Sequence, residues 1–201
     1  MSTNVRFVDE IDEGFSWIEE PRLRRTSHAL VADGRVWVID PFDGEGVEER
    51  VRALGEPAGV IQLLNRHGRD SAVWSERLGV PLHLMPSAVA GSPFRVLPIA
   101  DNRLWTEVAL WWPERRTLVC GDVLGTIPFF RSGDEPVGMH PILRLRPPRS
   151  LRDLGVEHLL VGHGEGIHGP DTAAAVETAL RTARRRLPRL VAGLPGALRH
   201  G

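Results

Sequence analysis

The chain has 201 residues, a length that suits one domain with a substantial core. Its formal charge of −1 favours neither nucleic acid nor an anionic membrane as a partner. All 25 basic residues are arginine, which excludes lysine Schiff-base chemistry, and the single cysteine excludes an internal disulfide. The chain opens with no signal-like segment and contains no apolar run as long as a membrane span, so we expect a soluble cytoplasmic protein.

The first half of the chain favours a sheet followed by helices. Apolar and polar residues alternate in its first forty residues, and Asp33-Gly34 marks a tight turn between two strands. The strand expected over 59–64 is apolar except for Gln62, which is typical of a covered sheet. The strands are expected over 5–8, 15–18, 29–32, 35–39 and 59–64, and the helices over 46–54 and 71–78. Asp70 stands at the position that caps the second helix.

The second half repeats this theme, with strands expected over 94–99, 104–112, 117–121 and 159–161. A long helix is expected over 171–187, ended by Pro188. Strands followed by helices in each half, roughly 1–92 and 93–201, predict two packed sheets covered by helices, within one domain over 1–201. The proline-rich segment between Asp122 and Leu151 carries Phe129 and Phe130, which either cover the mouth of a site, anchor a partner or pack on the core.

Several predicted strands end in residues that carry chemistry. The hairpin ends in Asp40-Pro41, the strand over 117–121 leads into Gly121-Asp122, and the last strand leads into Gly162-His163-Gly164. The loop Leu-Leu-Asn-Arg-His-Gly-Arg-Asp-Ser over 63–71 follows the apolar strand. In this order and at these separations, the set resembles the metallo-β-lactamase superfamily over most of the chain. The resemblance implies an α+β fold, a four-layer αββα sandwich.

The same resemblance implies that most metal ligands of the family are absent. The family loop reads Thr-His-x-His-x-Asp-His, and alignment on Asp70 places Arg66, Gly68 and Ser71 at its histidine positions. A further histidine, expected before the Gly-Asp strand, falls near Arg103. Arginine stays protonated and glycine has no side chain, so neither binds zinc. A dinuclear hydrolase is therefore not expected.

The ligands that remain by this mapping are Asp70, Asp122 and His163. They imply at most one divalent ion (zinc, manganese or iron), with no cofactor as the first expectation. Because Arg66 and Arg103 stand at former ligand positions, we expect them to pair with the aspartates and replace the missing cations. If an ion is held, Asp122 and His163 are the candidate catalytic residues, with Asp122 orienting the water.

Three interpretations of function follow from these residues. The first is a metallo-β-lactamase-fold protein whose degenerate site lacks dinuclear hydrolase activity. One alternative is a mononuclear hydrolase of an ester, thioester or amide; another is a non-catalytic binding or scaffold protein for an anionic ligand or a protein partner. Outside these three interpretations stands an unrelated α/β protein with coincidental strand endings. Substrate and oligomeric state are not encoded in any recognisable pattern.

Other histidines and the cysteine offer weaker candidates. Side-chain alternation predicts that His67 points away from the ligand positions. His140 and His168 lie in loops rich in proline and glycine and would add ligands only if those loops fold inward. Cys120 is either a nucleophile with His163 as its base or a small core residue. Asp70 has helix capping as its alternative role, and His163 has a metal-free hydrogen bond to Asp70 or Asp122.

Overall fold

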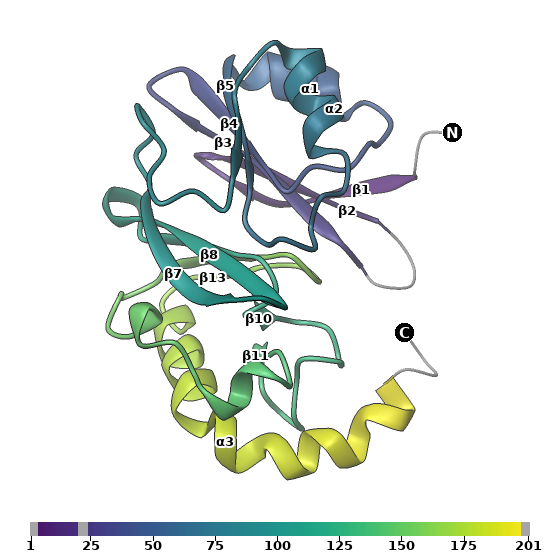
Figure 1. Ribbon diagram of the computed structural model, residues 1–201, viewed down its shortest axis with the longest axis vertical. Helices are drawn as coiled ribbons and strands as arrows, with labels where there is room; N and C mark the ends of the chain where they lie inside the picture. The colour runs from purple at the N-terminus through teal and green to yellow at the C-terminus, as the bar shows by residue number, and fades with distance from the viewer. Residues whose placement is uncertain (1–3, 20–23, 198–201) are drawn as a thin grey trace.

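The computed structural model describes residues 4–19 and 24–197. Two β-sheets pack face to face, and helices cover the outer face of each sheet (Figure 1). This confirms the αββα layering predicted from the order of strands and helices. Within the described ranges, no helix is both long enough and apolar enough to cross a membrane.

The first sheet has six strands that follow one another in chain order. The first four strands pair antiparallel, and the last three strands of the sheet run parallel to one another. Parallel neighbours need a crossover connection, and the two helices α1 (Val47–Leu54) and α2 (Ser71–Leu78) supply these. The strands are β1 (Val5–Ile11), β2 (Gly14–Glu19), β3 (Thr26–Ala32), β4 (Arg35–Ile39), β5 (Glu56–Gln62) and β6 (Leu82–Leu84).

The second sheet has five strands in the order β13-β12-β9-β8-β7. Its central pair, β9 and β12, is parallel, and every other pair is antiparallel. Between these two strands the chain forms a small ribbon of β10 (Leu124–Gly125) and β11 (Gly138–Met139). The five strands are β7 (Arg95–Asn102), β8 (Trp105–Trp112), β9 (Thr117–Cys120), β12 (His158–Val161) and β13 (Ile167–His168).

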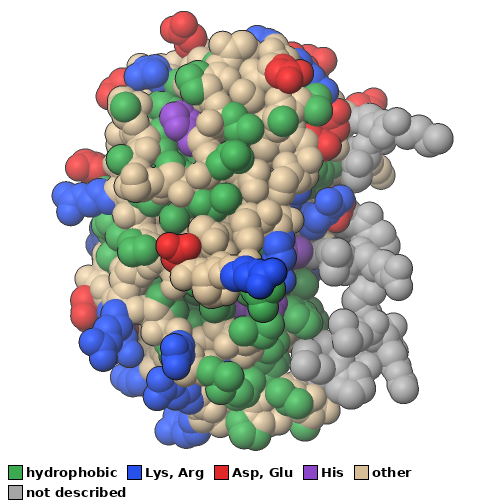
Figure 2. Space-filling view, viewed as in Figure 1, with side chains coloured by type: hydrophobic (Ala, Val, Ile, Leu, Met, Phe, Trp, Pro, Cys, Tyr) green, Lys and Arg blue, Asp and Glu red, His purple; other side chains and the backbone are tan. Residues whose placement is uncertain are grey.

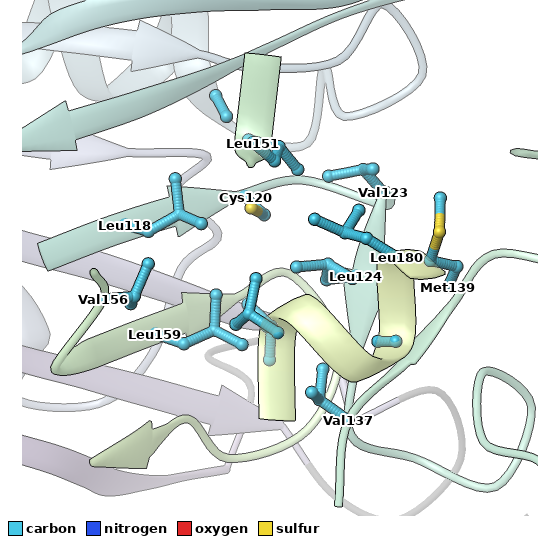
Figure 3. Packing of buried hydrophobic residues seen from close by; sticks show 14 of the residues in the cluster. Leu118, Cys120, Val123, Leu124, Val137, Met139, Leu151, Val156, Leu159 and Leu180 are labelled. Atoms are coloured by element: carbon cyan, nitrogen blue, oxygen red, sulfur yellow. The ribbon is translucent and has the colours of Figure 1, made fainter. Parts of the chain in front are cut away.

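Three apolar layers hold the four structural layers together. Strand β8 shows why its sequence is almost continuously apolar: Val108 and Leu110 face the first sheet, whereas Ala109 and Trp111 face helix α3 (Thr172–Ala197). Leu118 and Leu159 of the second sheet pack with Leu180 of that helix (Figure 3). The third layer lies between the first sheet and helices α1 and α2.

Two boundaries differ from the sequence prediction. Helix α3 continues past Pro188 to Ala197, so the expectation that this proline ends the helix was wrong. An internal proline removes one hydrogen bond and bends a helix that packing otherwise supports, and Figure 1 shows α3 changing direction along its length. Strand β5 ends at Gln62 instead of residue 64, and this difference changes the orientation of the loop that follows.

Candidate metal centre

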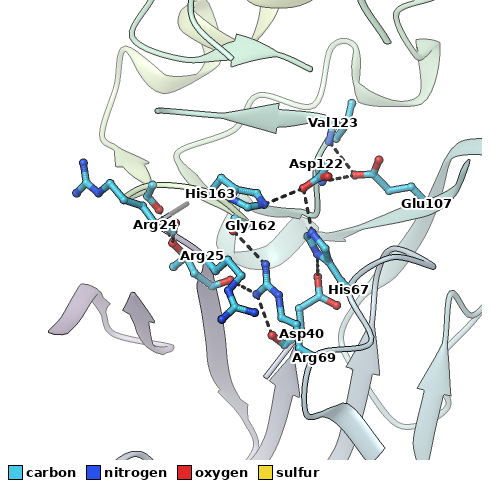
Figure 4. Close-up of polar contacts among 12 residues, drawn as sticks. Arg24, Arg25, Asp40, His67, Arg69, Glu107, Asp122, Val123, Gly162 and His163 are labelled. Atoms are coloured by element: carbon cyan, nitrogen blue, oxygen red, sulfur yellow. Dashed lines mark hydrogen bonds and ion pairs between the residues drawn. The ribbon is translucent and has the colours of Figure 1, made fainter. Parts of the chain in front are cut away.

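The candidate site forms where strand ends from both sheets meet. In the parallel pair β9 and β12, Cys120 lies opposite Val161, so the residues that follow both strands leave the sheet at the same edge. In the parallel pair β4 and β5, Ile39 lies opposite Ile61, which brings Asp40 beside the loop after β5. Carboxyl ends of parallel strands are where α/β folds place their ligand-binding residues. Figure 4 shows both sets of loops facing each other.

Three side chains converge at this edge. Nε2 of His67 lies 3.0 Å from Oδ1 of Asp122, and Nε2 of His163 lies 3.2 Å from the same oxygen (Figure 4). The three donor atoms all lie within 4.8 Å of one another, and no other group of this kind occurs among the residues that the structure describes. The structure thus brings together the predicted Asp122 and His163, with His67 as the third member.

Asp40 fixes the orientation of the His67 imidazole. Its Oδ2 lies 2.8 Å from Nδ1 of His67, and its Oδ1 accepts a 2.8 Å hydrogen bond from the backbone amide of Leu63. With the proton held on Nδ1, the lone pair on Nε2 is directed at Asp122. A carboxylate behind a histidine is the usual support for a metal-binding imidazole.

The electrostatics of the group also fit a cation. Oδ1 of Asp122 is buried and accepts no aligned hydrogen bond from any described residue. Burial acts to raise the pKa of Asp122, but its contacts with His163 and His67 outweigh this and hold the pKa well below the ordinary value. The carboxylate is therefore ionised, and its inward oxygen faces imidazole nitrogens in the way that a shared divalent ion requires.

Protonation of His67 is the alternative to an ion. Burial and the nearby Arg69 act to lower the pKa of His67, but Asp40 and Asp122 outweigh them and raise the pKa above its ordinary value. In the absence of an ion, the imidazole carries a proton between the two carboxylates. Metal binding at this group therefore releases a proton from His67.

Glu107 anchors the loop that carries Asp122. Its Oε1 accepts 2.8 Å hydrogen bonds from the backbone amides of Asp122 and Val123, and its Oε2 accepts a 2.7 Å hydrogen bond from Nε1 of Trp105. The side chain is completely buried, and burial raises its pKa to about 7. Sequence reasoning missed this residue, although an acidic side chain inside an otherwise apolar strand was a visible signal.

Arg69 ties three backbone segments together beneath the site. Its guanidinium donates hydrogen bonds to the carbonyls of Thr26 at 2.7 Å, Asp40 at 3.0 Å and Gly162 at 3.2 Å. These carbonyls belong to both sheets, so one side chain joins the segments from which the site is built (Figure 4). Its positive charge also offsets the nearby carboxylates.

Aromatic rings surround the second-sheet side of the site. Phe130 is buried and stacks on the His163 ring with centroids 5.8 Å apart, and the half-buried Phe129 packs edge-on against Phe130. His140 packs against Trp105 at 4.6 Å and Phe129 at 5.3 Å. Burial lowers the pKa of His140 to about 4, so this ring is neutral at pH 7. His140 lies beside the ligand group and is not one of its three members.

The structure does not support the expectation that Arg66 and Arg103 pair with the aspartates. Arg66 is exposed and lies over the Trp105 ring, 4.0 Å from its centroid, and Arg103 is exposed at the turn between β7 and β8. The arginine beside the carboxylates is Arg69 instead. The physical reason is that the loop turns after β5, so the residues that face the site are not those expected from an alignment on Asp70.

His67 and Asp70 also differ from the sequence prediction. His67 was expected to point away, but its amide donates to the carbonyl of Leu64 in a turn, and strand alternation does not apply there. Asp70 lies at the first position before α2 but makes no side-chain cap, and its Oδ2 accepts a 2.8 Å hydrogen bond from the amide of Asp43. It is not part of the ligand group.

Cys120 lies in the core and not in the site. Its side chain packs in the layer between the second sheet and α3 (Figure 3), and burial raises the pKa of its thiol well above the ordinary value. A neutral buried thiol is a poor nucleophile, which favours the core interpretation of this residue.

No family model matches the sequence, and no curated protein matches it. Solved structures do resemble the chain. The DIM-1 metallo-β-lactamase exposed to ceftazidime has a TM-score of 0.62 at 14% identity, covering 91% of this chain and 99% of that one. A fragment of a putative diflavin flavoprotein from Nostoc sp. PCC 7120 has a TM-score of 0.60 at 14% identity, covering 92% and 99%.

A metallo-β-lactamase from Erythrobacter litoralis gives a TM-score of 0.57 at 11% identity, covering 92% of this chain and 94% of that one. Identities this low show shared architecture and carry no information on substrate or reaction. With its two mixed β-sheets flanked by helices, this chain has the metallo-β-lactamase-like fold.

Proposed function

We propose that this protein is a metal-dependent hydrolase that works with one divalent ion held by His67, Asp122 and His163. One observation carries the proposal: three donor atoms from three separate loops converge within 4.8 Å. The oriented imidazole of His67, with Asp40 behind it, supports the same conclusion.

The donor set favours zinc, with manganese or iron as alternatives. Two imidazole nitrogens and one carboxylate oxygen match the three protein ligands of many catalytic zinc sites, which keep a further position for water or substrate. When bound, such an ion supplies a water that attacks an ester, thioester or amide carbonyl at neutral pH.

The protein's own residues have distinct tasks in this proposal. Asp122 stays ionised and orients the attacking water through its carboxylate. Asp40 keeps the proton of His67 on Nδ1, and Glu107 fixes the backbone on which Asp122 is carried. Phe130 stacks on His163 and excludes water from that side of the ring.

One observation favours a second function, a binding protein without catalysis. The raised pKa of His67 means that a proton alone can neutralise the group between Asp40 and Asp122. A site satisfied in this way needs no ion to remain folded. Under this alternative, the purified chain contains no metal and hydrolyses no acyl substrate.

The test compares His67→Ala, Asp122→Ala and His163→Ala with the unaltered chain, using Arg66→Ala as a control outside the ligand group. We expect each of the three variants to lose one bound ion, measured by elemental analysis, and to lose hydrolysis of p-nitrophenyl ester and thioester substrates. Arg66→Ala should retain both. Hydrolysis that persists in Asp122→Ala at the unaltered rate contradicts the catalytic proposal, and a metal-free unaltered chain favours the binding function.

A further inference from the structure

A second pair of histidines lies outside the candidate metal centre. His158 and His168 are directly opposite each other in the antiparallel pair β12 and β13, at the edge of the second sheet. Their Nδ1 atoms lie 3.1 Å apart. Two nitrogens bound to one zinc ion at tetrahedral geometry are about 3.3 Å apart, given the usual zinc to nitrogen distance. The two rings therefore already have the spacing of a ligand pair.

Asp9 orients one of these rings from the other sheet. Its Oδ1 lies 3.3 Å from Nε2 of His168 and accepts a 2.8 Å hydrogen bond from the amide of Gly166. The Asp9 side chain is 4% exposed. With the Nε2 proton of His168 held by this carboxylate, its Nδ1 lone pair is directed at His158. Asp40 gives His67 the same kind of support, through the opposite ring nitrogen.

The surroundings of the pair favour a cation. Both histidines line an open pocket of about 470 Å³, which is also lined by the acidic residues Glu10, Asp12, Glu13, Glu114 and Glu157. Only two arginines of the described chain share this lining, Arg115 and Arg116. Each is already paired, with Glu13 at 3.1 Å and with Glu157 at 2.5 Å. Glu10 pairs with Arg50, 2.8 Å away and outside the lining, so the excess of negative charge in the pocket rests on Asp12 and Glu114.

We propose that His158 and His168 bind a divalent transition-metal ion through their Nδ1 atoms, with Asp9 as a positioning residue. Imidazole pairs suit zinc, copper and nickel, and water completes the coordination. Asp9 belongs to β1 of the first sheet and both histidines belong to the second, so the bound ion stabilises the seam between the sheets. The site is structural and independent of the proposed hydrolase centre.

The primary experiment is a calorimetric titration of the chelator-treated chain with Zn²⁺. We expect the unaltered chain to bind two ions and the double variant His158→Gln/His168→Gln to bind one. The double variant Asp122→Ala/His163→Ala should also bind one, which separates the two sites from each other. His83→Gln is the matched control, because His83 lies in neither group, and it should bind as the unaltered chain does.

A second measurement on the unaltered chain requires no variant to fold. Imidazole ¹⁵N and ¹³C NMR signals of His158 and His168 should shift on addition of Zn²⁺ and broaden on addition of Cu²⁺. The proposal is overturned if these signals stay unchanged at saturating zinc, or if His158→Gln/His168→Gln binds as many ions as the unaltered chain.

Asp9→Asn tests the positioning role. We expect about 10–100-fold weaker zinc binding, in line with the loss of a supporting carboxylate. The His168 ¹⁵N signals should also show its proton moving from Nε2 to Nδ1, a change that a purely structural role for Asp9 does not produce. Unchanged affinity together with an unchanged tautomer contradicts the assignment of Asp9.

Discussion

The two sides of the candidate metal centre are stabilised by side chains of opposite charge. On the first-sheet side, the cationic Arg69 donates to backbone carbonyls where strands end. On the second-sheet side, the buried Glu107 accepts from backbone amides of the Asp122 loop. Loops that leave a sheet inside a protein expose unpaired backbone groups, and each must find a partner. The positions of the three candidate ligands therefore depend on residues that are not members of the group.

Replacement of Arg69 tests the first-sheet side and has the largest expected effect. Arg69→Met keeps the aliphatic stem but removes three charge-assisted hydrogen bonds to backbone carbonyls. The Asp40 carbonyl still accepts from Oγ of Ser27 at 2.6 Å, and the Gly162 carbonyl still accepts from the amide of Thr26 at 2.9 Å. Since a hydrogen bond that involves a charged group contributes about 1.5–3 kcal/mol, we expect the loss of three to lower the free energy of unfolding by about 4 kcal/mol. Urea denaturation measures this change, with Arg66→Met as the control. A loss of less than 1 kcal/mol shows that water replaces the guanidinium.

Replacement of Glu107 tests the second-sheet side through pH. Burial raises the pKa of Glu107 from 4.5 to about 7, so the folded protein binds this proton more tightly than the unfolded chain does. Its contribution to stability is present below pH 4.5 and is lost as the pH rises to 7, an effect of about 3 kcal/mol. Glu107→Gln removes this dependence because the amide does not titrate.

The measurement is the difference in unfolding free energy between the two proteins from pH 4.5 to 8, in the presence of a chelator. The difference isolates Glu107, since the buried His28 and the half-buried His140, whose pKa values fall to about 4, affect both proteins equally. Their sign is opposite: they add stability as the pH rises from 4 to 6.5. Parallel profiles for the two proteins contradict the assignment of a buried carboxyl that titrates near pH 7.

Replacement of Asp40 is expected to move the imidazole proton of His67 from one ring nitrogen to the other. In Asp40→Asn, the amide oxygen still accepts from Leu63, but the amide nitrogen donates to Nδ1 of His67. The imidazole proton then lies on Nε2, which blocks that ligand atom. We expect zinc affinity to fall about 10–100-fold, or about 1.4–2.7 kcal/mol, in competition with a chromophoric chelator. Asp43→Asn, at an exposed ion pair with Arg77, is the control.

If zinc affinity is unchanged in Asp40→Asn, Nε2 is not the ring atom through which His67 binds the ion. The raised pKa of His67 allows a second test, based on the pH dependence of zinc affinity. Metal binding competes with the proton between Asp40 and Asp122, so zinc affinity should increase with pH through the titration of His67. The substituted protein should show a smaller increase, because only one carboxylate then holds that proton.

Replacement of Arg66 has the smallest expected effect. Its guanidinium lies over the Trp105 ring at the surface, a contact that contributes about 0.5–1 kcal/mol. Arg66→Met should therefore change stability by less than 1 kcal/mol and leave zinc affinity within a factor of two of the unaltered value, roughly 0.4 kcal/mol. A large loss of metal binding would restore the interpretation that this arginine belongs to the site.

The sequence allowed the second-sheet residues to be predicted but not the loop of the first sheet. Asp122 and His163 each lie two residues after a strand residue, Cys120 and Val161. These two strand residues lie opposite each other in the parallel register, so the positions of Asp122 and His163 depend on strand geometry. His67 lies in a turn, where the side-chain direction depends on hydrogen bonds that the sequence does not specify. His67 lies five residues beyond the end of β5 at Gln62, where strand alternation no longer predicts the direction of a side chain.

The supporting residues were harder to predict than the ligands. Glu107 and Arg69 are charged, and charged residues are normally assigned to the surface, where Figure 2 shows many acidic and basic side chains of this chain. Only the tertiary structure shows that the backbone groups of two loops require them. The layered fold was predictable because a nearly apolar run such as residues 59–64 indicates a sheet covered on both faces.

The position of Cys120 makes its thiol a probe for the separation of α3 from the second sheet. The chain has a single thiol, and that thiol is buried between the second sheet and α3 with its pKa raised. Alkylating reagents reach it only when this layer separates, and the reaction requires the thiolate. The rate of labelling in native buffer therefore measures how often the helix detaches from the sheet, and any ion that stiffens the molecule should slow that rate.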